Sequence, residues 1–480
     1  MFYEKFWHIT IRQMLRRIER LYRERTALQW RRDGQIFTVS YGELMEDVWR
    51  LAGRFQALGL EARPLVIDGR NTYEQVVAFL AGAAMGAIVA PLSFDLPLES
   101  LRDLITRIRP AGLVYDQEDR DILADVTAGC GPVLIPCTDG TDSVAAVVSG
   151  NGPLYQGDGA QSPEDPVLLL ATSGSTKRSK LVLLSHYALL PHSELETQRS
   201  LFVLPMYHIA GLNGLMNDLA RGIPVCLSTL GRGILDMAWF QPKDIFAVPS
   251  FVELLVQRAK AGRVDLSNLS SLTSGGAPQS SETEEYLEDL GIYNISLYGA
   301  TETAGIVDYS LPSRFRRGSV GMPGPWNDIR ISPRGEVLVR GPQVMLRYLD
   351  DPEATAQALA EGWYHTGDLG SMDQDGFLYI TGRISNVIVL SNGENVSPEA
   401  VEVKLAACPD ILECVVLGRG DKLAAQIWCG ADAGESVRGR VKEFVAAYNR
   451  TVPSYLAIRN LEFRDRPFDK TVTGKLKRPK

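Results

Sequence analysis

The sequence has few cysteines, and no recognisable pattern joins them into a site. The 480 residues include six, at positions 130, 137, 226, 408, 414 and 429. No C-x-x-C spacing and no paired histidines accompany them, which argues against a zinc site or a disulfide framework. Reduced thiols fit the cytosol best, so we expect a cytoplasmic protein. The first residues also lack the apolar core and small-residue cleavage site of a secretion signal.

The chain also lacks an excess of positive charge. Its 50 lysines and arginines are outnumbered by 58 aspartates and glutamates, giving a formal net charge of -8 at pH 7. Such a balance provides no general attraction to nucleic acid or to an anionic membrane. We therefore expect no nucleic-acid partner. The basic tail Lys475–Lys480 is a local exception.

Long hydrophobic runs are absent, with one exception. Residues 76–92 carry no charge and include Gly82-x-x-x-Gly86, a spacing that helix pairs in lipid favour. The run is slightly short for a membrane span, is rich in alanine and glycine, and lies between polar segments. A buried helix and strand of an α/β domain explain it better, so no membrane span is expected.

Strand-like and helix-like segments alternate through the first four-fifths of the chain, which favours parallel sheets covered by helices. The strand-like segments include Leu65–Ile67, Gly112–Tyr115, Pro224–Leu227 and Ile245–Val248. Helical patterns begin at Tyr73 and at Val252. From Ser310 the character of the sequence changes, and Gly335–Gly341 and Gly376–Ile380 are typical of antiparallel strands between turns.

A second, smaller unit is predicted to begin near Arg383, because the chain is longer than one hydrophobic core usually supports. The pattern of this unit predicts two helices and two strands, over Pro398–Ala407 and Val437–Asn449, and over Glu413–Leu417 and Ala424–Cys429. About a hundred residues in this order make a small α+β domain. The predicted domains are therefore residues 1–382 and 383–480.

The segment Thr172–Lys180 contains hydroxyls, one glycine and three cations directly after the apolar run Val167–Leu170. Backbone N–H groups, hydroxyls and positive charge together suit a polyphosphate. The segment is not the G-x-x-x-x-G-K-[ST] loop of the common nucleotidases. Alone, such a segment is more often an ordinary surface turn, so the interpretation depends on what lies downstream.

Three later segments carry side chains of matching chemistry. Directly after an apolar run, Thr301 offers a hydroxyl and Glu302 a carboxylate, which is a hard ligand suited to Mg²⁺ on a nucleotide. Asp368 lies in a predicted tight, glycine-flanked turn, where a carboxylate can accept two hydrogen bonds from a ribose. Lys475 lies in a basic, glycine-containing tail, from which a flexible lysine can reach a developing anion. Singly, each of these is typical of a turn or a solvated tail.

In their order and spacing, these segments resemble the AMP-forming acyl-adenylate superfamily of acyl-CoA synthetases, stand-alone adenylation enzymes and luciferase-like proteins. The resemblance covers nearly the whole chain and extends to further segments at Tyr41–Leu44, Asn71–Leu92, Leu204–Gly211 and Thr273–Pro278. It implies an α/β fold with a large N-terminal domain of helix-covered sheets and a β-rich subdomain. It also implies a small, mobile α+β C-terminal domain, which rotates between two half-reactions.

The resemblance implies a ligase that joins a carboxylic acid to ATP, giving acyl-AMP and pyrophosphate, and then transfers the acyl group to a thiol. ATP and Mg²⁺ are the implied cofactors. CoA or the phosphopantetheine of an acyl or peptidyl carrier protein is the implied acceptor. Because carboxylate attack on a phosphate brings anions together, such catalysis depends on positioning and on charge neutralisation.

The resemblance also implies the roles of single residues. Lys475 would bridge the carboxylate and the α-phosphate, Thr301 would hold the α-phosphate, and Glu302 would orient Mg²⁺. Asp368 would bind the ribose hydroxyls with the help of Arg383. The other nucleotide contacts would fall on Thr172, Ser173, Gly174, Ser175, Thr176, Lys180, Gly276, Ala277, Pro278, Tyr298 and Gly299.

A histidine at the position of His208 gates the acyl pocket in the superfamily, which adds His208 to the implied catalytic set. Relatives that activate amino acids usually carry an aspartate in this segment, where Tyr207 and His208 stand here. A simple carboxylic acid is therefore expected rather than an α-amino acid. The pocket is expected to involve Asn213, Gly214, Phe251 and Gly275, although these residues could equally belong to the core.

The chain departs from the superfamily pattern in two places. The phosphate loop has Lys177, Ser179 and Leu181 where the pattern has glycine, proline and glycine, which restricts its backbone. At the predicted hinge, Ser385 stands for an aspartate or lysine, and Val389 stands for a lysine. The missing lysine leaves the thiol-transfer step open, so an amide synthetase with an amine acceptor is an alternative. The altered loop motivates a third hypothesis, a degenerate protein that binds nucleotide or acyl-adenylate without turnover.

Overall fold

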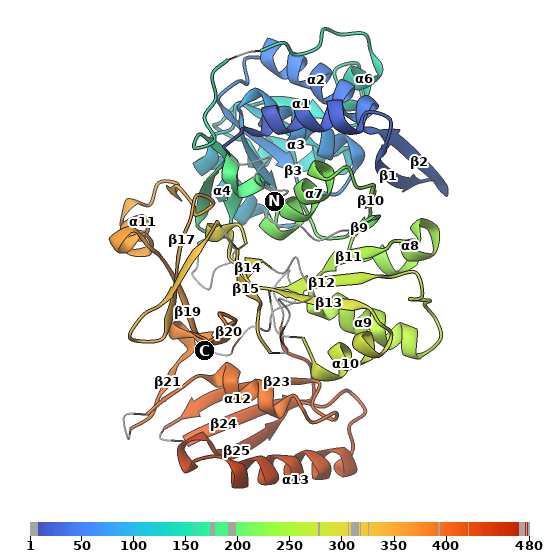
Figure 1. The fold of residues 1–480 in the computed structure, drawn as a ribbon. Helices are drawn as coiled ribbons and strands as arrows, with labels where there is room; N and C mark the ends of the chain where they lie inside the picture. The colour runs from blue at the N-terminus through green and yellow to red at the C-terminus, as the bar shows by residue number, and fades with distance from the viewer. Residues whose placement is uncertain are drawn as a thin grey trace.

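The computed structural model describes residues 8–157, 159–172, 178–190, 198–276, 279–305, 307–308, 316, 318–324, 326–391, 394–420, 422–469, 476 and 478. Two seven-stranded sheets, a four-stranded sheet and a three-stranded sheet organise these residues (Figure 1). The two large sheets and their helices make up most of the molecule. The four-stranded sheet lies to one side of them, and the three-stranded sheet lies at the end farthest from the N-terminal helices.

The first large sheet, hereafter the N-terminal sheet, is built mainly from residues 64–185. Its strands run in the order β18 (Arg347–Tyr348), β8 (Leu181–Ser185), β7 (Pro166–Ala171), β4 (Ile88–Leu92), β3 (Pro64–Asp68), β5 (Gly112–Tyr115) and β6 (Val133–Pro136). From β7 to β6 all neighbours are parallel, whereas β8 and β18 are antiparallel additions at one edge. The carboxyl ends of the parallel strands therefore share one edge.

The second large sheet, hereafter the central sheet, follows the same design. Its strands run in the order β13 (Tyr293–Leu297), β12 (Ser271–Gly275), β11 (Asp244–Ala247), β9 (Ser200–Phe202), β10 (Val225–Leu227), β1 (Thr26–Arg32) and β2 (Gln35–Ser40). Only the β1–β2 hairpin at one edge is antiparallel. The parallel sheets that the alternation in the sequence predicted are thus confirmed.

Helices cover the large sheets. One hydrophobic core joins both sheets through α1 (Ile11–Tyr22), α2 (Tyr41–Ala57), α3 (Tyr73–Met85), α6 (Val144–Ser149) and α7 (Ile209–Ala220). The N-terminal sheet packs its other face on α4 (Leu98–Ile108) and α5 (Leu123–Val126), and the central sheet packs on α8 (Gly233–Phe240), α9 (Pro249–Lys260) and α10 (Ser281–Asp289).

The uncharged run at residues 76–92 forms most of α3 and all of β4. Every residue of α3 is buried, because the helix lies inside the core that joins the two large sheets. Gly86 ends the helix with φ at 89°, a left-handed conformation that glycine adopts without strain. The predicted buried helix and strand are confirmed. Across the described residues, no helix is both long and apolar enough to cross a membrane.

The β-rich part is an antiparallel sheet in the order β16 (Asp328–Ile331), β17 (Glu336–Arg340), β19 (Tyr364–Met372) and β20 (Leu378–Arg383). Here one prediction was wrong, because residues 364–370 form a strand and not a tight turn. Gly367 takes a φ of 70°, and the register with β20 shifts between Leu369 and Gly370. The glycines thus permit an irregular strand. The shorter elements nearby are β14 (Val307–Asp308), β15 (Met322–Pro323) and α11 (Pro352–Ala358).

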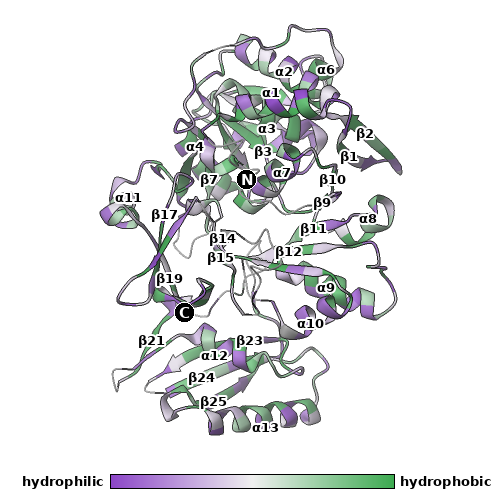
Figure 2. Cartoon of the chain, viewed as in Figure 1, coloured by the Kyte–Doolittle hydropathy of each residue, from purple (hydrophilic) through white to green (hydrophobic). Residues whose placement is uncertain are grey.

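The last hundred residues pack around their own core. This unit consists of β21 (Ile388–Val389), β22 (Asn395–Val396), α12 (Pro398–Leu405), β23 (Glu413–Arg419), β24 (Lys422–Trp428), α13 (Glu435–Thr451) and β25 (Ile458–Phe463). Figure 2 shows hydrophilic and hydrophobic residues alternating along α13, whose buried side chains include Val441, Val445 and Tyr448. The two predicted helices and two predicted strands are confirmed, and β25 was missed. The boundary between residues 382 and 383 stays a prediction.

Candidate active site

Four of the predicted site segments directly follow parallel strands at their carboxyl ends. Thr172 follows β7, Gly276 follows β12, and Tyr298 follows β13. The segment that ends at His208 follows β9 and leads into α7. In open parallel sheets, ligands bind beyond the carboxyl ends of the strands. The fold therefore places these segments where a ligand site is expected.

Asp368 is the centre of a small polar cluster, hereafter the ribose cluster after the role expected for it. Its side chain is 10% exposed, with Arg383 Nε at 2.6 Å from Oδ1 and the Tyr298 hydroxyl at 2.8 Å from Oδ2. The three side chains come from β19, β20 and the residue after β13. Burial and the adjacent Asp368 carboxylate raise the pKa of Tyr298, so its hydroxyl stays protonated and donates. Three residues that stand in separate sequence motifs are thus in direct contact.

Glu302 is held by a side chain that the sequence did not point out. It lies in the short helix η4 (Thr301–Thr303), and its Oε1 accepts a hydrogen bond of 2.8 Å from the Tyr348 hydroxyl. Lys180 Nζ lies 4.4 Å from the centre of the Tyr348 ring, a cation–π contact. Burial and the nearby Glu302 raise the pKa of Tyr348, which keeps it a donor. The end of the phosphate segment thus lies beside Glu302.

No motif predicts the contact between Tyr348 and Glu302. Tyr348 belongs to β18, which reaches η4 only because β18 pairs with β8, the strand that directly follows the phosphate segment. Tyr364, on β19, is buried close to both groups, and burial together with Glu302 raises its pKa. The local signal near Tyr348 is Asp351-Pro352 followed by a helical pattern, and it indicates a helix start rather than a site.

The two ends of the phosphate segment lie together. The Thr172 N–H donates to the Lys180 carbonyl over 2.9 Å. Beyond the loop, Arg178 Nε contacts the Asp103 carboxylate of α4 at 3.1 Å, and Arg107 Nη1 of the same helix donates to the Ser179 carbonyl over 2.8 Å. Helix α4 therefore anchors the exit of the segment. The predicted residues Ser173, Gly174, Ser175 and Thr176, and the departure at Lys177, lie outside the described residues.

The segment predicted to bind the acid lies at the start of α7. His208 is the N-cap residue of this helix, and its ring centre is 4.8 Å from that of Tyr207. Asn213, one turn into α7, donates from Nδ2 to the Ala304 carbonyl directly after η4. Its Oδ1 is buried and has no hydrogen-bond partner among the described residues. Asn213 thus joins the acid segment to the Glu302 turn.

The remaining candidates for the acid pocket are more scattered. A Cβ on Gly214 would lie 3.0 Å from the Phe246 ring, so this glycine fits α7 against β11. A Cβ on Gly275 would lie 2.8 Å from the Leu297 Cβ, where β12 and β13 end side by side. Phe251 belongs to the hydrophobic core under the central sheet, at 5% exposed, where its ring packs on Gly233. The packing described for Phe251 is therefore that of a core residue.

The turns expected around the adenine are only partly described. Gly276 is exposed, with φ at 89°, directly after β12. Gly299 is exposed between Tyr298 and η4. Ala277 and Pro278 lie outside the described residues. The described part of this turn therefore lies beside the β13 end that carries Tyr298.

The C-terminal tail is fixed at two points on the three-stranded unit. Arg478 Nη2 lies 2.6 Å from Glu402 Oε2 of α12 and 3.2 Å from Glu399 Oε1. Before the tail, the Phe468 N–H donates to Glu413 Oε2 of β23 over 2.7 Å. Lys475 lies outside the described residues. Ser385, the predicted hinge residue, lies in η7 (Ile384–Asn386) directly after β20 and is exposed.

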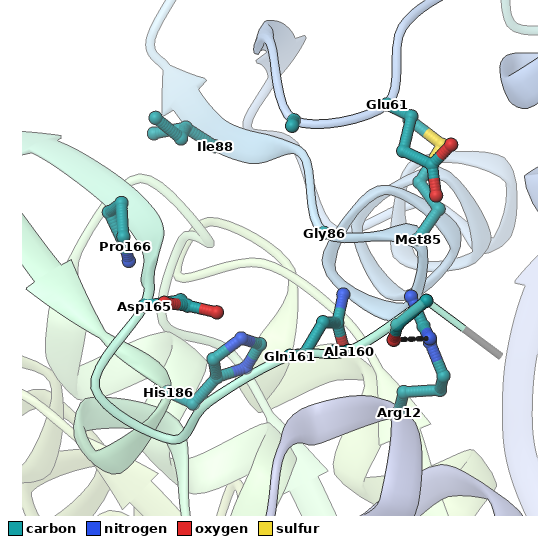
Figure 3. A pocket seen from close by; sticks show the side chains of 12 residues that line it. Arg12, Glu61, Met85, Gly86, Ile88, Ala160, Gln161, Asp165, Pro166 and His186 are labelled. Atoms are coloured by element: carbon teal, nitrogen blue, oxygen red, sulfur yellow. Dashed lines mark hydrogen bonds between the residues drawn. The ribbon is translucent and has the colours of Figure 1, made fainter.

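Two surface pockets lie away from these residues. They have volumes of about 320 and 360 Å³ and are lined at the beginnings of β4 and β7, by Ile88 and Pro166. Figure 3 shows the first, with His186 next to Asp165 and with Arg12 near Gln161. Since β4 and β7 are parallel, this edge is opposite to the one that carries Thr172. Neither pocket is lined by a residue predicted to belong to the site.

Comparison with known proteins agrees with this arrangement. The model of the AMP-binding enzyme family matches residues 15–349, and that of the AMP-binding enzyme C-terminal domain matches residues 385–480. The indoleacetate–CoA ligase of Aromatoleum aromaticum is 32% identical over 416 residues, or 80% of this chain and 81% of the relative. A feruloyl-CoA synthase from an Amycolatopsis species is 28% identical over 471 residues, or 91% of this chain and 92% of the relative.

A solved structure shows the same fold. The anthranilate CoA ligase AuaEII, in complex with anthranoyl-AMP, superimposes with a TM-score of 0.86 at 20% identity, over 98% of this chain and 96% of that one. The chain therefore belongs to the AMP-binding enzyme family, the AMP-forming acyl-adenylate superfamily that its motifs resemble. It is an enzyme of the AMP-forming ligase class, and its predicted fold class is confirmed.

Proposed function

We propose that this enzyme activates a small carboxylic acid with ATP, forming acyl-AMP and pyrophosphate, and transfers the acyl group to CoA. The observation that carries the proposal is the ribose cluster, in which Asp368 contacts both Tyr298 and Arg383. A buried carboxylate that two hydrogen-bond donors hold in place suits the vicinal hydroxyls of a nucleoside. Relatives that are CoA ligases of aryl acids support CoA as the acceptor.

The second support is the arrangement around Glu302. One of its oxygens accepts from Tyr348, which leaves the other for a cation. Among the described residues, no group of three histidine, cysteine or acidic side chains could hold a metal ion alone. This fits Mg²⁺, which usually takes one or two protein carboxylates and completes its shell with phosphate oxygens and water. Glu302 would hold that ion, which would neutralise phosphate charge when bound.

The roles of the other residues follow from their places. Thr301 would hold the α-phosphate, and Lys180, with the residues of the phosphate segment, would hold the outer phosphates. Lys475 would neutralise charge where the acid carboxylate meets the α-phosphate. His208 and Asn213 would border the acid, because α7 brings Asn213 to the turn that holds Glu302. Asn213 Oδ1 would then accept a hydrogen bond from the substrate or from a water molecule bound to it.

The choice of acceptor depends on the hinge region, where the chain departs from the superfamily pattern. Val389, where the superfamily pattern has a lysine, is 69% exposed on β21. A side chain this exposed can meet either a thiol or an amine acceptor. The presence of valine at position 389 therefore does not favour one class of acceptor over the other. The alternative of an amide synthetase therefore enters the experiment as a distinct outcome, as does a carrier-protein acceptor.

The experiment is ATP-dependent pyrophosphate release with a panel of indolyl, other aryl, fatty and amino acids. Each acid is tested without acceptor, with CoA, with a phosphopantetheinylated carrier protein and with simple amines. We expect release with one class of carboxylic acid, and sustained turnover with formation of an acyl-CoA. Turnover sustained only by an amine or only by the carrier protein would overturn the choice of CoA.

Two variants distinguish an effect on the ribose cluster from a general effect on the sheet that carries it. Asp368→Ala removes the carboxylate of the ribose cluster, and it is expected to weaken ATP binding. Asp328→Ala removes an exposed carboxylate on β16 of the same sheet, 2.6 Å from Arg340, and it should leave ATP binding unchanged. Equal effects of both changes would remove Asp368 from the nucleotide site, whereas ATP binding without pyrophosphate release from any acid would favour the degenerate binding protein.

A further inference from the structure

Strand β3 ends in a buried carboxyl group. Asp68 is the last residue of the strand and is 1% exposed. Gln75 Nε2, from the buried helix α3, donates to Asp68 Oδ2 over 3.0 Å, and Arg70 Nε lies 3.4 Å from the same oxygen. Both contacts therefore fall on one oxygen of the carboxyl group, and Oδ1 is left for a different partner.

A second buried carboxyl group lies opposite. Asp119, in the short helix η2 (Gln117–Ile122), is 8% exposed, and its Oδ1 lies 3.2 Å from Arg70 Nη2. Its Oδ2 is buried, and no N–H group or hydroxyl of the described residues donates to it. The side chains of Asp68 and Asp119 are within hydrogen-bonding reach of each other. A single proton held between them would therefore satisfy the oxygen that is otherwise without a donor.

The charges around this pair favour such a proton. Arg70 is shared by Asp68, Asp119, Asp95 and Glu118, at distances from 3.2 to 3.9 Å. Burial, together with the negative charges of Asp119 and Asp116, raises the pKa of Asp68 to about 8. The positive charge of Arg70 opposes this rise only in part. Burial also raises the pKa of Asp119. The other titratable groups facing the pair are Tyr207 and the buried Cys137.

The residues after Asp68 hold the segment that leads to His208. The Gly69 carbonyl accepts from the Met206 N–H over 3.1 Å, and Asn71 Nδ2 donates to the Leu204 carbonyl over 3.0 Å. A Cβ on Gly69 would lie 3.0 Å from both the backbone nitrogen and the ring of Tyr207. Because the two stretches touch without spare room, a shift of residues 69–71 must shift residues 204–207.

We propose that Asp68 and Asp119 share one proton, and that this proton positions Tyr207 and His208 for the acid. The proposal rests on the proposed function, which assigns residues 204–208 to the acid site. Asp68 Oδ1–H donates to Asp119 Oδ2, while Arg70 balances the remaining negative charge. Loss of the proton leaves two buried carboxylates in contact, and their repulsion displaces the end of β3 from η2. Both residues are positioning residues, since neither touches the reacting groups.

The first test is a comparison of unfolding, which needs no substrate. The amide in Asp68→Asn imitates a protonated carboxyl group. A raised pKa in the folded state means that the folded protein binds the proton more tightly than the unfolded chain does. The wild type should therefore lose stability relative to Asp68→Asn as the pH rises from about 4 to 8, with a constant difference above that range. A difference in the free energy of unfolding between the two proteins that stays the same at every pH would overturn the proposal of a shared proton.

The second test follows the contact between the two stretches. The Met206 N–H should exchange with solvent faster in the wild type than in Asp68→Asn at pH 9, and at equal rates in both at pH 7. Equal exchange at pH 9 would show that the proton does not hold residues 204–207. This measurement also needs no substrate, so absence of ligase activity would overturn the proposed function and leave this comparison intact.

The third test is the pH profile of the KM for the acid. In the wild type this KM should rise above pH 8, by up to about tenfold per pH unit if only the protonated pair binds the acid. The KM of Asp68→Asn should match the wild type at pH 7 and stay level at higher pH, whereas Asp68→Ala should raise the KM at every pH. Asp244→Asn is the matched control, because Asp244 is a buried carboxyl group of β11 whose pKa burial also raises. It should alter stability and leave the KM profile unchanged. The same alkaline rise in Asp68→Asn would overturn the positioning role.

Discussion

Arg383 Nε donates to Asp368 Oδ1 over 2.6 Å, and the two residues face each other across the register of β19 and β20. The carboxylate is buried, whereas 55% of the arginine side chain is exposed. Arg383 is also the last residue of β20, directly before the predicted hinge. The residue that would steady the ribose thus lies where the chain leaves the β-rich sheet for the three-stranded unit.

The first prediction concerns the ribose cluster. Asp368→Asn keeps the size of the side chain but removes the charge that accepts from Tyr298 and would accept from the ribose. Hydrogen bonds to charged groups contribute about 1.5–3 kcal/mol, so we expect the KM for ATP to rise about 10- to 100-fold. Steady-state pyrophosphate release at varied ATP measures this. The exposed Asp328→Asn should behave as the wild type, and an unchanged KM in Asp368→Asn would remove Asp368 from the nucleotide site.

The second prediction concerns the hydroxyl that holds Glu302. Tyr348→Phe deletes a donor 2.8 Å from Glu302 Oε1 and leaves the ring beneath Lys180 in place. With a net value of about 1 kcal/mol for one hydrogen bond, ATP should bind about fivefold more weakly in the presence of Mg²⁺. Calorimetric titration with and without Mg²⁺ measures the change. Tyr379→Phe, which deletes a hydroxyl 3.1 Å from Asp373, is the control and should have no effect.

The third prediction concerns the tail lysine. Lys475→Ala should slow acid-dependent pyrophosphate exchange about a hundredfold, as expected when one key charge-stabilising donor is lost. ATP affinity should change much less, because the proposed role of Lys475 is in the reacting complex. Lys404→Ala, at an exposed position of α12, should leave the exchange rate unchanged. An undiminished rate in Lys475→Ala would contradict the proposed role.

The fourth prediction concerns stability in acid. His186 is 1% exposed, its Nδ1 accepts from the Ile11 N–H at 3.2 Å, and burial lowers its pKa to about 4. A pKa lowered by folding means that the unfolded chain binds the proton first, so stability is lost as the pH falls from about 6.5 to 4. The free energy of unfolding should fall by up to about 1.4 kcal/mol per pH unit from this group. His186→Asn should lose this part of the slope in denaturant titrations, and an identical slope in both proteins would contradict it.

Much of the fold could be predicted because its buried elements are short, apolar and regularly spaced. The uncharged run at residues 76–92 had to be buried, and it forms α3 and β4. Strand β5 lies where a short apolar run, Gly112–Tyr115, is followed directly by the charged Asp116. The irregular strand around Gly367 was read as a turn, because a glycine at positive φ serves a bulge as well as a turn. Local pattern does not distinguish the two.

The site was predictable only where a motif carries it. Tyr298, Asp368 and Arg383 were each chosen from separate motifs, and the structure brings them into contact. Tyr348 was missed because its contact with Glu302 spans 46 residues and depends on the pairing of β18 with β8. The pair Asp68 and Asp119 was missed for the same reason. Two acidic residues 51 positions apart give no periodic signal, and only the parallel pairing of β3 with β5 places them face to face.

The two anchors of the tail limit what Lys475 can do. Arg478 is bound to α12, and Phe468 is bound to β23, so described residues on both sides of Lys475 are held by the same three-stranded unit. Three residues of extended chain span at most about 10 Å, which is the greatest distance that the chain allows between the backbones of Lys475 and Arg478. We therefore expect the position of the whole three-stranded unit, rather than a movement of the tail alone, to decide whether Lys475 reaches the nucleotide.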